Sequence, residues 1–194
     1  MRLCATIGHS NYAIDDFIRI LLSHRITTII DVRSVPYSRR HPQFNRETLK
    51  TDLNLHDIRY LYLGDRLGGR HTDPQVLFPD GRVNFTKVRE AAWFQEGITK
   101  VIEEIDTGFA VALMCAEKDP LRCHRFLLVC PALVRLGVTV VHITGQHEAL
   151  SQDEVEERLL MACGLDRHQP GLFEPTKTHK QLLEEAYDRI TRGR

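Results

Sequence analysis

Short apolar runs alternate along the first 145 residues with segments in which apolar residues recur at helical spacing. Runs typical of buried strands lie at residues 3–7, 26–30, 59–63, 109–114 and 138–143. Helical periodicity predicts helices near residues 14–22, 45–55, 88–105 and 120–136. Strands that alternate with helices predict an α/β fold, with a mainly parallel five-stranded sheet, helices on both faces and right-handed crossovers, a three-layer Rossmann-like arrangement.

The stretch from residue 109 to 136 passes from an apolar run to a polar turn and then to a helical pattern. Six apolar residues, 109–114, lead to Cys115, and a polar turn follows. Asp119-Pro120 is typical of a helix start, because Asp caps free N–H groups and Pro is tolerated at the first helical position. We therefore expect a buried helix that begins near Pro120, bends at Pro131 and ends at Gly137.

Two parts of the chain depart from the alternation. Residues 64–84 form a long polar segment of the kind that covers a functional site. Near the end, helical patterns at residues 153–161 and 178–191 are joined by a linker that contains Pro170 and Pro175. The expected organisation is a core domain of residues 1–148 with a C-terminal helical extension, residues 149–194, packed on it.

Composition narrows the functional classes. The 26 basic and 26 acidic residues cancel, so no overall field favours nucleic acid or a membrane, and 42% hydrophobic residues suffice for a sizeable core. Five cysteines without regular spacing give no disulfide framework. With no apolar run of transmembrane length and no signal peptide, we expect a cytoplasmic protein without a membrane partner.

Polar groups follow three of the predicted strands, in Gly8-His9-Ser10, Asp31-Val32-Arg33 and Cys115-Ala-Glu117. The carboxyl ends of parallel strands meet at one edge of a sheet, where ligands bind. A helix N-terminus at Pro120 and nearby arginines would make this edge electropositive and suited to phosphate; the arginines are Arg33, Arg39, Arg40, Arg122 and Arg125. The candidate catalytic residues are His9, Asp31, Cys115 and Glu117. The candidate anion- or substrate-binding residues are Ser10, Arg33, Ser38, His124 and Arg125.

These motifs resemble a known family. The matching segments are Gly8-His9-Ser10, Asp31-Val32-Arg33 with Pro36 and Ser38, Leu67-Gly68-Gly69, and Cys115-Ala-Glu-Lys-Asp-Pro120 with Cys123-His-Arg125. Together they resemble the family catalogued as domain of unknown function 488, over roughly residues 3–145. The resemblance implies the fold and the positions of the site, and it implies no reaction.

The preferred hypothesis is an enzyme that acts on a phosphate-bearing substrate, either a nucleotide or a nucleic acid. Arginines would hold the phosphate, while Glu117, Asp31 or His9 would handle protons. The cofactor is not specified by the sequence. A purely structural ion pair between Asp31 and Arg33 is the competing interpretation of those two residues.

Three alternatives stay open. Cys115 is a candidate nucleophile by analogy with rhodaneses and cysteine phosphatases, although Glu117 and burial oppose its ionisation and favour a packed, weakly reactive thiol. Zinc binding by Cys115, Cys123, His124 and His9 has suitable ligand types but no usual spacing, so we expect no metal. The non-enzymatic alternative is a nucleic-acid-binding module that stacks bases on Tyr37 and Phe44 of a basic loop, residues 34–44.

Overall fold

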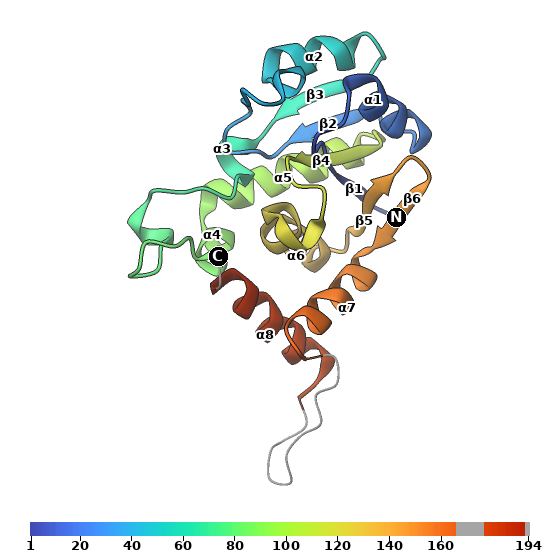
Figure 1. The fold of residues 1–194 in the computed structure, drawn as a ribbon. Coiled ribbons are helices and arrows are strands. Elements are labelled where there is room, and N and C mark those ends of the chain that lie inside the picture. Colours follow the sequence, from blue (N-terminus) through green and yellow to red (C-terminus); the bar gives the residue numbers. More distant parts are fainter. Residues whose placement is uncertain (166–176, 193–194) are drawn as a thin grey trace.

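A single mixed sheet lies between two helical layers in the computed structural model, which describes residues 1–165 and 177–192 (Figure 1). The linker expected around Pro170 and Pro175 lies outside these residues. The strand order is β3-β2-β4-β1-β5-β6, and every neighbouring pair is parallel except β5 and β6. The strands are β1 (Leu3–Gly8), β2 (Thr28–Asp31), β3 (Arg59–Tyr62), β4 (Val111–Cys115), β5 (Thr139–Gly145) and β6 (Glu148–Ser151).

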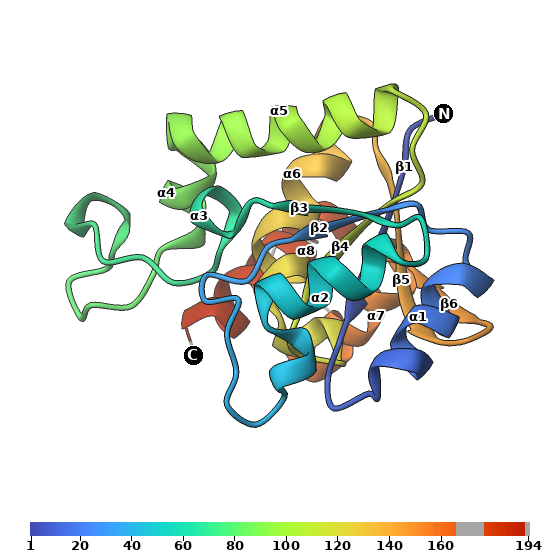
Figure 2. The same cartoon turned by 90° about the horizontal axis from the view of Figure 1, so that it is seen from above.

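Amphipathic helices cover both faces of the sheet (Figure 2). One face is covered by α1 (Ile14–Ser23) and α2 (Arg46–Asn54), and the other by α5 (Ala92–Asp106), α6 (Cys130–Arg135) and α7 (Gln152–Ala162). In α1, for example, Phe17, Ile18 and Leu21 recur at helical spacing and pack in one cluster with Ile7 and Ile29. The predicted three-layer α/β fold is therefore confirmed.

The remaining helices lie beside these layers. They are α3 (Gly64–Leu67), α4 (Phe85–Glu90) and α8 (His179–Arg192). Helix α8 packs on α7 (Figure 1) and buries Ala186. The Tyr187 ring of α8 lies 5.4 Å from the ring of Phe126. Ser151 and Glu154 form a reciprocal capping box at the start of α7. Within residues 1–165 and 177–192, every helix is too short or too polar to cross a lipid bilayer.

The sixth strand was not predicted. β6 folds back directly after β5 and pairs with it antiparallel, with Val141 opposite Ser151 and Ile143 opposite Ala149. Its four residues, Glu-Ala-Leu-Ser, place only two apolar side chains between polar ones, so no apolar run marks it in the sequence. The chain thereby covers the edge of β5 with a short, half-exposed strand.

Two predicted helices differ from expectation. The helix expected at residues 88–105 is split into α4 and α5 by Ala91, which has an extended backbone. The helix expected from Pro120 begins later, because Pro120–Arg122 forms only one 3-10 turn under the Asp119 cap and Cys123 is extended. Helical structure resumes as the π-helical turn Arg125–Val129, which leads into α6.

Pro131 gives the physical reason for this irregular turn. It has no N–H group to donate to the carbonyl oxygen of Leu127, four residues earlier. Arg89 from α4 donates its Nη1 group to that oxygen instead, at 3.2 Å. A side chain from another element therefore supplies the hydrogen bond that Pro131 cannot donate. Gly137, in the left-handed region at φ 76°, follows the end of the helix as expected.

The end of β1 approaches the turn after β4 very closely. The N–H groups of His9 and Ser10 donate to the carbonyl oxygens of Cys115 and Ala116 at 2.9 and 2.8 Å. A Cβ atom added to Gly8 would lie 1.8 Å from the carbonyl oxygen of Glu117. Any side chain at Gly8 would therefore force these two backbones apart.

We expect Gly8→Ala to lower the free energy of unfolding by on the order of 3 kcal/mol, because the clash is with backbone and cannot relax by a rotamer change. Gly145→Ala is the control, since a Cβ there meets only the Glu148 side chain, at 3.3 Å or more. Urea unfolding of both variants measures the effect. Equal midpoints for the two variants would contradict the close approach.

Candidate functional site

Three central strands bring the predicted site residues together. β2, β4 and β1 are neighbours, with Gly8 opposite Cys115 and Asp31 opposite Met114, so their carboxyl ends are level. A cavity of about 590 Å³ opens at this edge. The predicted residues that line it are His9, Arg33, Ser38, Cys115, Glu117 and His124. Ser10, Asp31 and Arg125 do not line it.

Asp31 and Arg33 form a buried ion pair beneath the cavity. The Arg33 Nη2 and Nε groups donate to Asp31 at 2.6 and 2.9 Å, and Tyr60 donates its hydroxyl to Asp31 at 2.6 Å. Arg33 Nη2 also donates to the carbonyl oxygen of Phe44. Asp31 is fully buried and its oxygens are occupied, so the structure does not place it as a proton acceptor for a ligand in the cavity.

His9 is a neutral ring that supports Arg33. Its Nδ1 group donates to the carbonyl oxygen of Ser10 at 2.9 Å, which leaves Nε2 to accept from Arg33 Nη1 at 3.1 Å. The ring is stacked on Phe44 at 4.2 Å. Burial, with the nearby Arg33 charge, lowers the pKa of His9 to about 4. Because its one lone pair is already engaged, His9 is poorly placed to take a proton from a substrate.

The two predicted serines have different surroundings. Ser10 has a left-handed backbone with φ 48° and donates its hydroxyl to Asn11, outside the cavity. Ser38 lines the cavity, and its hydroxyl oxygen accepts from the backbone N–H of His41 at 3.1 Å. Asn45 accepts from the Ser38 N–H at 2.7 Å and so ties this loop to the start of α2.

Cys115, Glu117 and His124 form the floor of the cavity. The Cys115 thiol donates to Glu117 Oε2 at 3.0 Å, and its sulfur lies 3.6 Å from His124 Nδ1. His124 donates its Nε2 group to the carbonyl oxygen of Val32 at 2.9 Å, which directs Nδ1 of the ring toward Cys115. Gly69 makes room for this ring, since a Cβ there would meet it at 2.7 Å.

Cys123 lies next to this floor but is fully buried. The ligand atoms of Cys115, Cys123 and His124 all lie within 4.8 Å of one another, as a metal site requires. The pKa of Cys115 is raised well above its usual range, because the adjacent Cys123 sulfur and burial both disfavour its thiolate. Burial also opposes ionisation of Cys123, but the Cys115 thiol and the Arg125 guanidinium hold its pKa below the usual range.

Arg125 is a correction to the predicted anion-binding set. Its side chain is fully buried and donates to the carbonyl oxygens of Glu117 and Lys118 and to the Thr6 hydroxyl. These acceptors are all neutral protein groups. Arg125 therefore fixes the turn after β4 from below and does not reach a ligand in the cavity.

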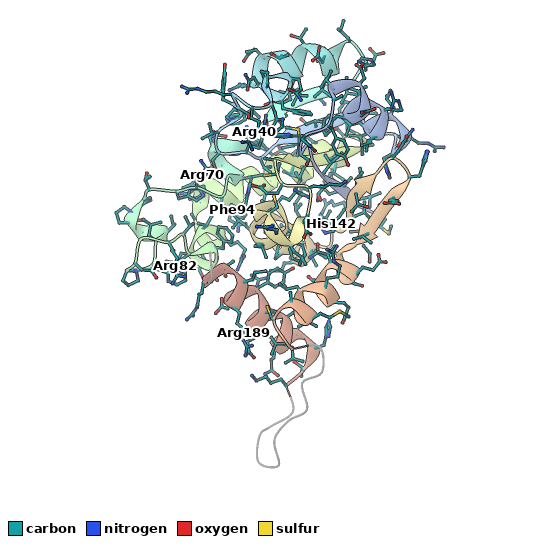
Figure 3. The ribbon with its side chains drawn as sticks, viewed as in Figure 1. Arg40, Arg70, Arg82, Phe94, His142 and Arg189 are labelled. Carbon is teal, nitrogen blue, oxygen red and sulfur yellow. The ribbon has the colours of Figure 1, made fainter. Side chains whose placement is uncertain are left out.

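Several lining residues were not in the predicted set. Arg70 and Arg82 come from the long polar segment between α3 and α4 (Figure 3). Thr191 comes from α8, and Tyr37, in the loop after β2, was expected only as a base-stacking residue of the binding-module alternative. Arg122, expected among the arginines of this edge, also lines the cavity, from the 3-10 turn Pro120–Arg122. The signal for Arg70 was its place directly after Gly68-Gly69, but nothing in the local sequence marks Thr191.

A buried polar chain runs from the site to the C-terminal helices. Thr6 donates to His142 Nδ1 at 2.8 Å, and His142 Nε2 donates to Gln152 Oε1 at 3.0 Å. Gln152 then donates to Glu156 and to the hydroxyl of Tyr187. Both nitrogens of His142, which Figure 3 labels, have hydrogen-bond partners, and burial lowers its pKa to about 4.

Comparisons with known proteins give one family match. A family model described as "Domain of unknown function DUF488" matches residues 13–130, which is more than half of the chain. The match includes Arg33, Cys115, Glu117 and His124 and ends before Pro131. No curated protein and no solved structure matches the chain.

The two buried histidines predict acid sensitivity. Between about pH 6.5 and 4 the unfolded chain protonates His9 and His142 while the folded chain keeps them neutral, so the unfolded state binds more protons. The free energy of unfolding should therefore fall as pH falls, by up to about 1.4 kcal/mol per pH unit for each ring. Urea unfolding between pH 7 and 5 measures this slope.

His142→Asn should remove about half of this slope, whereas the matched change at exposed His147 should leave it unchanged. A flat profile between pH 7 and 5 in the unmodified protein would show that these rings are not held neutral.

Proposed function

The chain belongs to the DUF488 family, a domain family of unknown function, and we propose that it is an enzyme whose cavity binds a phosphate-bearing, nucleotide-sized substrate. The observation that carries the proposal is a pair of cations at the cavity, Arg70 and Arg122. Neither side chain has a hydrogen-bonded or ionic partner among the described residues. Arginine without a protein partner at a cavity wall is suited to a phosphate ligand.

The other cations at the cavity have protein partners. Arg82 is held by Asp80 through two hydrogen bonds of 2.9 and 2.6 Å, and Arg33 is committed to Asp31. These pairs contribute little net charge, so Arg70 and Arg122 supply the attraction for an anion. This assignment replaces the predicted role of Arg33 and Arg125 as the anion-binding pair.

The cavity also has apolar walls. Val35, Tyr37 and Phe85 line it, and Tyr37 is 63% exposed, which leaves its ring free to pack on a planar group. A volume of about 590 Å³ lies within the range of small-molecule sites. A nucleotide, with a phosphate and a flat base, fits this combination. Phe44 is fully buried beneath His9, so it cannot stack bases as the binding-module alternative requires.

Glu117 is the group that we propose handles the proton. Asp31 and His9, the other two predicted candidates, already accept hydrogen bonds from Arg33. Glu117 is exposed at the cavity floor, and the acceptor nitrogen of His124 faces the same cluster. Nucleophilic chemistry at Cys115 is less well supported, because the raised pKa keeps it a thiol that donates to Glu117.

We expect Arg122→Ala and Arg70→Ala each to weaken binding of a nucleoside monophosphate by about tenfold, because each removes one charged donor from the phosphate. Arg40→Ala is the matched control, since Arg40 is exposed and does not line the cavity (Figure 3). Isothermal titration calorimetry with inorganic phosphate and with a panel of nucleoside monophosphates measures the affinities.

The proposal fails if neither phosphate nor any nucleotide binds, or if the Arg40 variant loses as much affinity as the other two. A steep dependence on salt with single-stranded nucleic acid, but no binding of monophosphates, would favour the nucleic-acid-binding module instead.

A further inference from the structure

We propose that Cys115, Cys123 and His124 bind a zinc ion at the floor of the cavity, with the Glu117 carboxylate at the fourth position. The inference goes beyond the proposed function and does not depend on it. It revises the expectation from the sequence that the chain has no metal site.

The distances suit a tetrahedral ion. Zinc takes thiolate sulfur at about 2.3 Å and imidazole nitrogen at about 2.0–2.1 Å, so two such ligands at a tetrahedral angle lie about 3.6 Å apart. The Cys115 sulfur and His124 Nδ1 are 3.6 Å apart. Cys123 completes a set whose three ligand atoms lie within 4.8 Å of one another. Glu117 also lines the cavity, and its Oε2 is 3.0 Å from the Cys115 sulfur, so the carboxylate would move away from the sulfur by about 0.6 Å to share an ion with it.

The histidine is already oriented for metal binding. His124 donates Nε2–H to the carbonyl oxygen of Val32 at 2.9 Å, which directs the unprotonated Nδ1 to the two sulfurs. A backbone acceptor behind the ring is the usual support of a metal-binding histidine. The close contact with Gly69 restricts the ring further.

Charge balance supports four ligands. Arg125 is fully buried, the oxygens to which it donates are neutral, and it also lies next to the Cys123 sulfur. A dication with two thiolates and one carboxylate carries a net charge of about minus one, which the Arg125 guanidinium offsets. Binding displaces the two thiol protons to solvent, so no oxidant or reductant is needed.

An ion at this site is reachable from the cavity and can act on a ligand bound there. Cys115, Glu117 and His124 line the cavity, so an ion can enter from it, and a ligand can displace the Glu117 carboxylate, which is then free to accept a proton. A zinc ion with an exchangeable fourth position polarises a bound oxygen or activates water. The site thus has the ligands of a catalytic zinc centre of the two-cysteine, one-histidine type.

The test uses the full chain, purified without chelator, and measures its metal content by mass spectrometry. We expect about one zinc ion per chain. After removal of metal under reducing conditions, Co²⁺ titration should give a 1:1 complex with thiolate charge-transfer bands in the near ultraviolet and the visible bands of a tetrahedral ion. His124→Asn should abolish these bands, and Glu117→Gln should weaken Co²⁺ binding at least about tenfold.

Cys163→Ser is the matched cysteine control, because Cys163 is partly exposed and lies near Ala186, outside the cluster. Its spectrum should equal that of the unmodified protein. Cys123→Ser should lose the bands, and its circular dichroism shows whether it folds. If it does not, the exposed Glu117 and half-buried His124 variants decide the question.

Absence of thiolate bands in the unmodified protein, or their persistence in both His124→Asn and Glu117→Gln, overturns the proposal. Phosphate titration of the metal-free protein separates this result from the proposed function. If the unmodified protein binds phosphate, Arg122→Ala loses that binding and no cobalt binds, the result contradicts the zinc site alone. If cobalt binds but no anion does, the result contradicts the proposed function alone.

Discussion

The burial of Arg125 is the constraint on which the cavity depends. A guanidinium group taken out of water must find acceptors for its N–H groups, and the carbonyl oxygens of Glu117 and Lys118 are within reach. Their hydrogen bonds turn the carbonyls after β4 inward, where the turn also meets Gly8. Because the turn is fixed from below, its Glu117 side chain faces the cavity. Arg125 is thus a structural residue with a direct effect on the geometry of the site.

The same guanidinium links the site to the C-terminal helices. Through Thr6, His142 and Gln152 the hydrogen-bond chain continues to Tyr187 in α8, all of it largely shielded from water. The next turn of α8 carries Thr191, which lines the cavity. The C-terminal helix therefore contributes to the site both as a wall and as the end of a buried network, although it lies outside the residues matched by the family model.

The sequence predicted those features that have a local signal. Apolar runs mark the five parallel strands, and polar residues directly after three of them located the cavity. The role of each side chain was harder to predict, because it depends on partners that distant segments supply. Arg33 donates to His9 and to the Phe44 carbonyl oxygen, and the His9 ring stacks on Phe44. No spacing of residues in the sequence predicts these contacts. Similarly, Cys123 has an extended backbone after a 3-10 turn, which brings its sulfur close to that of Cys115. The regular helix expected from Pro120 would place the Cys123 side chain differently.

The strand order also has a consequence for how the protein is made. β1 is synthesised first, yet both of its partners, β4 and β5, follow more than a hundred residues later. At roughly 5–20 residues per second, β1 spends on the order of 5–20 s on the ribosome with both hydrogen-bonding edges open. Its apolar side chains and free backbone groups are available to wrong partners during that time. β1, whose end is followed directly by His9 at the cavity, therefore has the longest delay between its own synthesis and that of its partner strands.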